Sequence, residues 1–150
     1  MSGKIQPQFV DTNVLVYAHD RIAGSKGDAA RVLLEELWRK GCGCLSVQVL
    51  QELYVTLTQK VAMPMTREQA REVVASLNEW RVHVPDAADV LDAIDLQRRH
   101  QVSFWDAMIL LSANKLGCSI LWTEDLQAGR MYDDVLVKSP FANTPDAIRP

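Results

Sequence analysis

The sequence has no apolar run near the roughly 18 residues that a membrane-spanning helix requires, although 48% of its 150 residues are hydrophobic. Its polar first eight residues also lack the apolar segment of a signal peptide. We therefore expect a soluble, cytoplasmic protein that does not bind membranes. The length suits one core, so residues 1–150 are predicted to form a single domain with a short irregular tail beginning near residue 139.

Cysteine, histidine and excess positive charge are also scarce. Cys42, Cys44 and Cys118 are odd in number, and the first two share one face of a predicted strand, so we expect them in the core rather than in disulfides or a zinc site. The three histidines have no paired ligand spacing. The net charge of −3 argues against holding nucleic acid by bulk charge, although bound cations would make a nucleic-acid substrate compatible with it.

Short apolar segments alternate with amphipathic helical patterns along the chain. Strands are predicted at 5–10, 42–46, 81–84, 119–122 and 134–137, with helical periodicity between the first four. This order is typical of a parallel sheet with helices on both faces. We predict an α/β fold, a three-layer α/β/α sandwich with a central, mainly parallel five-stranded sheet.

The first predicted strand ends in Asp11, and Thr12 and Asn13 follow before a helical pattern begins. In open α/β sheets functional residues lie at the carboxyl ends of strands, which makes Asp11 a candidate site residue. Capping of the following helix by one of these three residues is the alternative, and taken alone it is the commoner role.

Three further acids have comparable positions. Asp125 follows the strand at 119–122, Glu52 lies at the edge of an apolar helix face, and Asp106 lies in the first turn of the most apolar helix. Each of these acids also has a purely structural explanation. Asp125 would be a turn residue, Glu52 a solvated helix residue and Asp106 the third residue of a capping box. A cluster of carboxylates near a core stays ionised only with a cation, and all-oxygen ligands select Mg²⁺ or Mn²⁺ over Zn²⁺.

Four segments, VDTNVL (10–15), SVQVLQEL (46–53), FWDA (104–107) and TEDL (123–126), resemble in order the motifs of the PIN-domain nucleases, in particular the VapC-type toxins of bacterial toxin–antitoxin pairs. The resemblance covers nearly the whole chain. It implies four acids that are both catalytic and metal-binding, namely Asp11, Glu52, Asp106 and Asp125. It also implies three polar residues that support them, namely Thr12, Asn13 and Thr123. Glu124 adjoins Asp125, and the spacing from Thr123 favours Asp125.

The same resemblance implies a Mg²⁺- or Mn²⁺-dependent endoribonuclease, the toxin of a type II system, with an RNA substrate, a cognate antitoxin protein and a homodimeric assembly. The candidate RNA-contacting residues are the basic residues Lys60, Arg67, Arg98 and Arg99. A place on solvated helix faces explains these residues equally well. Trp105 is a candidate for stacking on a base, with packing as the favoured alternative. The candidate residues of an apolar antitoxin groove are Phe104, Trp105, Trp38 and Leu15.

Other functional classes fit the sequence less well. A metal-dependent phosphatase of the haloacid-dehalogenase type needs a second Asp two residues after Asp11, where this chain has Asn13. A phosphate-receiver domain needs a late strand-end lysine, which Trp122-Thr123 does not provide. A catalytically weak PIN-like module for RNA binding or regulation is the remaining alternative, and retention of all four acids argues against it.

Overall fold

The computed structural model describes residues 5–141, which contain a six-stranded sheet. The strands are β1 (Gln8–Val10), β2 (Gly43–Ser46), β3 (Arg81–His83), β4 (Ile120–Trp122), β5 (Met131–Tyr132) and β6 (Val135–Lys138). The prediction of five strands was therefore one short. β5 has only two residues, too few for a readable apolar pattern, and it pairs antiparallel with β6. Most of the predicted C-terminal tail, residues 142–150, lies outside the described residues.

The order of the strands places β1 in the middle of the sheet. The order is β3-β2-β1-β4-β6-β5, and every pairing apart from the β5–β6 hairpin is parallel. The chain adds β2 and β3 on one side of β1, and β4 and β6 on the other. This reversal creates a topological switch point between β1 and β4, where ligand sites of such sheets lie.

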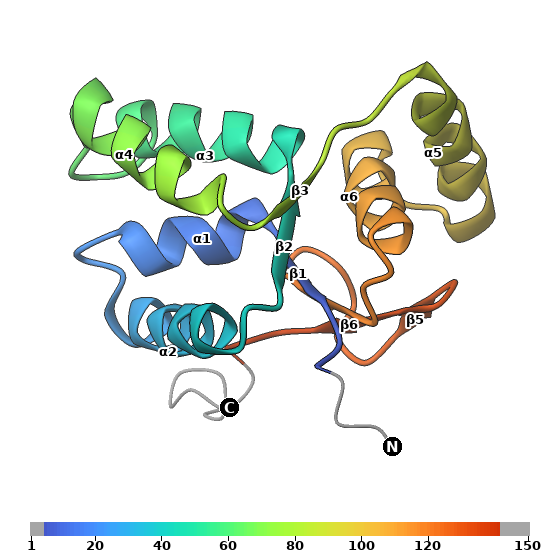
Figure 1. The fold of residues 1–150 in the computed structure, drawn as a ribbon, viewed down its shortest axis with the longest axis horizontal. Coiled ribbons are helices and arrows are strands. Elements are labelled where there is room, and N and C mark those ends of the chain that lie inside the picture. The colour runs from blue at the N-terminus through green and yellow to red at the C-terminus, as the bar shows by residue number, and fades with distance from the viewer. Residues whose placement is uncertain (1–4, 142–150) are drawn as a thin grey trace.

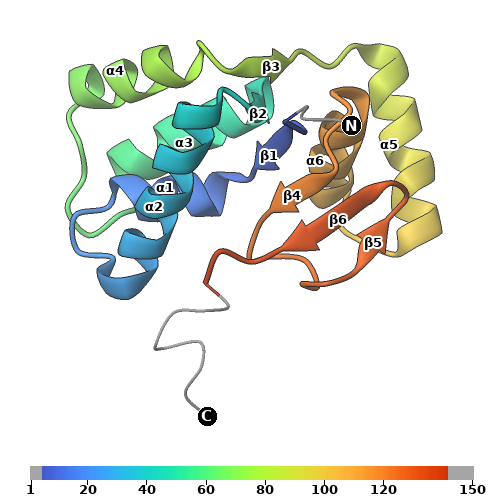
Figure 2. The same cartoon turned by 60° about the horizontal axis from the view of Figure 1, so that its bottom comes forward.

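Helices cover both faces of the sheet, as predicted. They are α1 (Thr12–His19), α2 (Gly24–Lys40), α3 (Val47–Gln59), α4 (Arg67–Leu77), α5 (Ala87–His100) and α6 (Phe104–Lys115). α1 to α4 gather on one side of the strands, and α5 and α6 on the other (Figure 1). A turned view shows α6 behind β4 and β6, which it contacts (Figure 2). Within residues 5–141 no helix combines the length and apolarity that a membrane span needs.

The central strands are apolar because helices cover both of their faces. Phe9 and Val10 of β1, and Leu121 of β4, have no exposed surface. The three cysteines are buried and unbridged, which confirms their predicted place in the core. Polar groups of the central strands are thus displaced to the strand ends, where the candidate site begins.

Candidate active site

Two neighbouring strand ends form the base of the site. Val10, the last residue of β1, is paired with Trp122, the last residue of β4. Asp11 and Thr123 follow them and lie side by side, with Thr123 Oγ1 donating a hydrogen bond of 2.8 Å to Asp11 Oδ2. Both side chains are buried, Thr123 completely. The switch point of the sheet therefore holds a buried carboxylate.

Asp11 combines the two roles considered for it. As the N-cap of α1, it accepts a hydrogen bond of 2.7 Å at Oδ1 from Thr12 N. Burial raises the pKa of its carboxyl to about 7; the hydrogen bonds from Thr123 and Thr12 oppose this rise, and the charges of Asp125 and Glu52 add to it. Full ionisation of Asp11 at neutral pH therefore calls for a nearby cation.

α3 carries Glu52 to the wall of the site. Ser46 ends β2 and caps α3, because its Oγ accepts a hydrogen bond of 3.4 Å from Val49 N. Val49 and Leu53 are buried on the inward face of α3, and Glu52 is exposed beside them. Thr12 Oγ1 donates a hydrogen bond of 2.8 Å to Glu52 Oε1. This bond links α3 to α1 and turns Glu52 toward Asp11's helix.

The first turn of α6 contributes Asp106. Ser103 caps this helix, since its Oγ accepts a hydrogen bond of 3.1 Å from Asp106 N. The cap engages the backbone of Asp106, and the residue lines the cleft described below. Burial raises the pKa of its carboxyl; the hydrogen bond to Ser103 lowers it, and the charges of Asp125 and Glu52 raise it further. Because the rest of α6 is largely buried, this acid stands on a rigid element.

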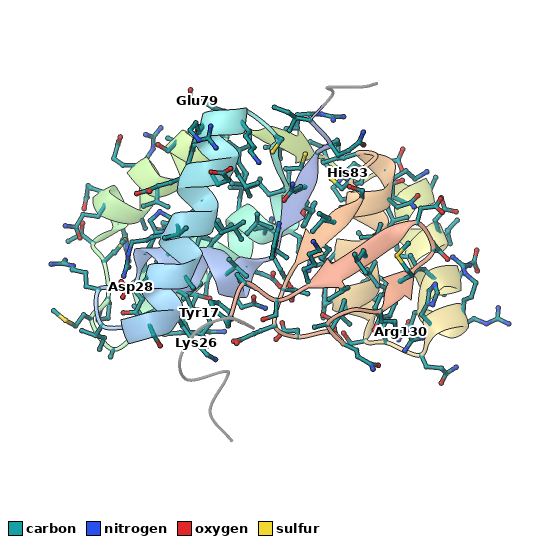
Figure 3. The ribbon with its side chains drawn as sticks, turned by 90° about the horizontal axis from the view of Figure 1, so that it is seen from below. Tyr17, Lys26, Asp28, Glu79, His83 and Arg130 are labelled. Carbon is teal, nitrogen blue, oxygen red and sulfur yellow. The ribbon has the colours of Figure 1, made fainter. Side chains whose placement is uncertain are left out.

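The two adjacent acids after β4 have different partners. Asp125 N donates a hydrogen bond of 3.0 Å to Thr123 Oγ1. Glu124 instead accepts hydrogen bonds from Tyr17 OH at 2.7 Å and from Lys26 Nζ at 2.9 Å. Tyr17 and Lys26 lie together near the start of α2 (Figure 3). Lys26 thus balances the charge of Glu124, which leaves Asp125 as the acid available to the site.

Asn13 connects the two strand ends through the nitrogen and the oxygen of its side-chain amide. Its Nδ2 donates a hydrogen bond of 3.3 Å to Thr123 Oγ1, and its Oδ1 accepts one of 3.4 Å from Glu124 N. Asn13 therefore holds the loop that carries Asp125 against the start of α1.

The four acids line one cleft of about 730 Å³, with walls formed by α1 and α3 and completed by the first turn of α6 and the loop after β4. Thr12 and Asn13 also line it, whereas Thr123 is buried next to Asp11. The described lining contains six acids and a single basic residue, Lys60. Tyr17 and Gln48 are lining residues that we did not predict, because only the packing of α1 against α3 brings them there.

Other candidate contact residues are distributed over the molecule. Lys60 lines the cleft, whereas Arg99 forms an ion pair of 2.7 Å with Asp133 away from it. Leu15 has no exposed surface, so its prediction as an antitoxin-groove residue was wrong: it packs in the core. Trp105 is 62% exposed and lines the cleft, which excludes packing in the core of this chain.

The chemistry of these donors fits a divalent ion. The charges of Asp125 and Glu52 raise the pKa of both Asp11 and Asp106, so they oppose the ionisation of these two aspartates. A hard cation with oxygen ligands relieves that repulsion. As the side chains stand within residues 5–141, no three Asp, Glu, His or Cys residues form a ready-made metal cluster. An ion shared by these acids therefore requires their side chains to turn toward it.

Comparison with known proteins gives the fold family. Residues 9–133 match the PIN domain family, and no curated protein matches the sequence. A toxin–antitoxin complex from Klebsiella pneumoniae has a TM-score of 0.63 and 18% identity, and the match covers 89% of this chain and 97% of that one. DNA-bound VapBC from Salmonella typhimurium has a TM-score of 0.63 and 17% identity, over 91% and 99% of the two chains.

A third similar structure is VapC20 of Mycobacterium tuberculosis, described as a sarcin–ricin loop cleaving toxin. It has a TM-score of 0.57 and 21% identity, and the match covers 76% of this chain and 86% of that one. At identities this low, these similarities show a shared fold.

Proposed function

This chain belongs to the PIN-domain family, and from that membership we propose that it is an endoribonuclease that uses Mg²⁺ or Mn²⁺ to hydrolyse phosphodiester bonds in RNA. The observation that carries the proposal is the convergence of four carboxylates on one cleft, from the ends of β1 and β4 and from α3 and α6. A module that only binds RNA would have no need to keep four mutually repelling acids together.

Each acid has a proposed role. Asp11, Asp106 and Asp125 would hold the ion, and Glu52 would either ligate it or orient the attacking water. When bound, the ion supplies an acidified water and neutralises charge that develops on the phosphate. Thr123 and Thr12 hold Asp11 and Glu52 in place through their hydroxyl hydrogen bonds. In-line attack by water would leave a 5′-phosphate and a 3′-hydroxyl.

The nuclease proposal is tested with purified protein and a mixed RNA pool. We expect cleavage with Mn²⁺, none with EDTA, and none from Asp11→Asn or Asp106→Asn. Asp134→Asn, which changes an exposed acid outside the cleft lining, is the matched control and should cleave normally. Cleavage that persists in EDTA or in both site variants would rule out the carboxylate–metal mechanism. Intact RNA with wild type under every condition would favour the binding module.

We further propose that the protein is the toxin of a toxin–antitoxin pair and acts as a homodimer in the cytoplasm, where its RNA substrate is. Similar folds occur in toxin–antitoxin complexes from Klebsiella pneumoniae and Salmonella typhimurium, which supports an antitoxin partner. For the dimer, the support is a group of exposed apolar side chains on and just before α5, namely Val84, Val90, Leu91 and Ile94.

Growth of bacteria that express the protein tests the toxin role. We expect growth arrest with wild type and normal growth with Asp106→Asn at equal protein level. Arrest of equal strength with Asp106→Asn would contradict toxicity through RNA cleavage. A monomer in solution at micromolar concentration would contradict the homodimer.

A further inference from the structure

A cluster of four side chains lies beside the site acids, and each comes from a different segment of the chain. Tyr17 is on α1, Lys26 is in the first turn of α2, Glu124 follows β4 and Phe141 follows β6. Tyr17 OH and Lys26 Nζ bind separate oxygens of Glu124, Oε1 at 2.7 Å and Oε2 at 2.9 Å. We call these four residues the Glu124 clamp. Both carboxylate oxygens of Glu124 are thus engaged within the chain itself.

Two aromatic rings define the position of Lys26 in this clamp. The rings of Tyr17 and Phe141 meet edge to face, with 5.0 Å between their centroids and an interplanar angle of 77°. Lys26 Nζ lies 5.1 Å from the first centroid and 5.3 Å from the second, within the roughly 6 Å of a cation–π contact. Phe141 is buried, so its ring is fixed by the core. The ammonium is therefore held by two rings as well as by the Glu124 carboxylate.

Close packing of α2 on α1 brings Lys26 to Tyr17, and Figure 3 shows the two residues side by side. Gly27 is buried at this contact, and a Cβ added there would lie 3.1 Å from the carbonyl oxygen of Tyr17. A side chain so close to backbone would push the two helices apart. The lack of a side chain at Gly27 thus keeps the ammonium next to the Tyr17 ring and within reach of Glu124.

The clamp holds the loop that carries Asp125. In this loop Glu124 N donates a hydrogen bond of 3.4 Å to Asn13 Oδ1, which is longer than the usual 2.7–3.2 Å. Asp125 N donates one of 3.0 Å to Thr123 Oγ1, but this bond spans only two residues. The side chain of Glu124 adds two short bonds to other elements, one to α1 and one to α2. The clamp therefore ties the loop to the helices just before Asp125.

We propose that the Glu124 clamp positions Asp125 for metal binding. Tyr17, Lys26 and Phe141 are positioning residues that hold the Glu124 carboxylate, and the fixed carboxylate holds the neighbouring backbone. Asp125 is thereby kept on the cleft wall, where it can reach an ion, and Glu124 is kept from competing for that ion. The proposal rests on the nuclease function proposed above and assigns to it residues other than the four acids.

A purely electrostatic role for Lys26 makes the opposite prediction. An ammonium beside an acidic cleft repels a divalent cation, so removal of the ammonium would tighten metal binding if its charge were its only contribution. The clamp predicts weaker metal binding, because Asp125 is no longer held in place. The sign of the change in affinity therefore separates the two roles.

Calorimetric titration of Mn²⁺ into the metal-free protein, without RNA, tests the proposal. We expect Tyr17→Phe and Lys26→Met each to weaken Mn²⁺ binding about 10-fold, the lower end of the effect of outer-shell partners. Tyr17→Phe leaves the ring and the net charge unchanged. Lys26→Arg can still pair with Glu124 and should retain most of the affinity. The matched control is Lys40→Met, which should not weaken binding, because Lys40 forms an ion pair of 3.0 Å with Glu36 at the other end of α2.

A double-mutant cycle shows whether Lys26 acts through Glu124. Glu124→Gln removes the carboxylate that Lys26 holds, so the addition of Lys26→Met to it should weaken Mn²⁺ binding no further. The double variant has the net charge of wild type, so its loss of affinity cannot come from a change in overall charge. Additive losses would overturn a route through Glu124.

Hydrogen exchange of the loop amides in the metal-free protein gives a second measurement. The amides of Glu124 and Asp125 should exchange about 10-fold faster in Lys26→Met than in wild type, because the loop opens more often. Phe141→Leu keeps an apolar side chain but removes the ring, and it should cause a smaller rise. The amides of α6 should exchange as in wild type. Unchanged exchange of the loop amides in Lys26→Met would overturn the clamp.

Failure of the clamp is distinguishable from failure of the nuclease proposal. If wild type binds Mn²⁺ and cleaves RNA, but Tyr17→Phe and Lys26→Met bind Mn²⁺ as tightly as Lys40→Met or more tightly, the clamp is overturned and the nuclease stands. If wild type binds no Mn²⁺, the nuclease proposal falls, and the positioning of Asp125 for an ion falls with it. Loop exchange then still shows whether these side chains hold the loop.

Discussion

At the scale of single residues, the site uses side chains that also build the fold. Asp11 caps α1 while its second oxygen accepts the hydrogen bond of Thr123. Ser103 caps α6 through the backbone of Asp106. These cap hydrogen bonds fix the positions of Asp11 and Asp106 at the first turns of their helices, because a short cap bond restricts both of its partners. Removal of an acid should consequently change stability as well as activity.

Substitution of Asp11 should raise stability in the absence of metal. Its pKa is about 7 in the folded protein, against 3.8 ordinarily. Between these values the unfolded chain has lost the proton that the folded chain keeps, so Asp11 lowers the free energy of unfolding as pH rises from about 4 to about 7. The full effect is about 4 kcal/mol. In EDTA, Asp11→Asn should therefore be the more stable form at pH 8.

Urea unfolding at pH 4 and pH 8, with EDTA, measures this difference. The gain from Asp11→Asn should be largest at pH 8 and should shrink toward pH 4, where Asp11 itself is protonated. The control Asp134→Asn changes an exposed acid and should show no comparable gain. Equal stabilities of wild type and Asp11→Asn at pH 8 would contradict the raised pKa.

Glu124 and Asp125 should differ sharply in importance. Glu124 is held by Tyr17 and Lys26, whereas Asp125 is free to ligate. Asp125→Asn should lower kcat by more than the roughly 10- to 100-fold typical of outer-shell partners of a metal site. Glu124→Gln should stay within that range, because it loosens only the support of the loop. Rates of RNA cleavage at saturating Mn²⁺ measure both effects. A larger fall in kcat from Glu124→Gln than from Asp125→Asn would show that Glu124, rather than Asp125, is the acid that the site uses.

At the scale of elements, the position of Glu52 depends on how β2 packs. α3 follows β2 directly, so a shift of β2 displaces the wall of the cleft. Gly43 of β2 lies under the ring of Trp80, where an added Cβ would approach the ring to 2.6 Å. The absence of a side chain at Gly43 thus allows the segment between α4 and β3 to pack closely on the sheet.

Gly43→Ala should therefore destabilise the protein by about 1–3 kcal/mol, as overpacking of a core does. In a Trp80→Leu background the additional cost should largely disappear, because the clash is with the indole ring. Urea unfolding of the four forms of this double-mutant cycle measures the coupling. Strictly additive effects would show that Gly43 matters for a reason other than Trp80.

At the scale of the whole molecule, the sheet order determines which distant residues meet. The switch point brings Asp11 next to Thr123, 112 residues apart in sequence. One core of buried apolar residues extends from β1 through α6 to β6. The cleft acids thus lie over a shared core, and a ligand that joins them should stabilise the molecule as one unit.

Mn²⁺ should raise the melting temperature in a single cooperative transition. At 100 times the dissociation constant, one bound ion adds about 2.7 kcal/mol to the free energy of unfolding. That corresponds to about 5–10 °C for a chain of this size. Asp106→Asn should show a much smaller rise. Two separate transitions in calorimetry would contradict the single domain predicted for residues 1–150.

The order of apolar and polar residues along the chain already determined the fold class and the candidate acids. Burial of β1 on both faces requires an apolar run such as Phe9-Val10, and the polar residues after it mark a strand end, so the α/β class and the candidate acids were readable in the chain. The two-residue β5 was not, because its pairing with β6 depends on a turn rather than on apolar periodicity. Only the tertiary structure decided which side chains face one another: that Glu124 pairs with Lys26, that Leu15 is buried, and that Trp105 and Lys60 flank one cleft. Those outcomes depend on packing between segments far apart in sequence, which no local pattern encodes.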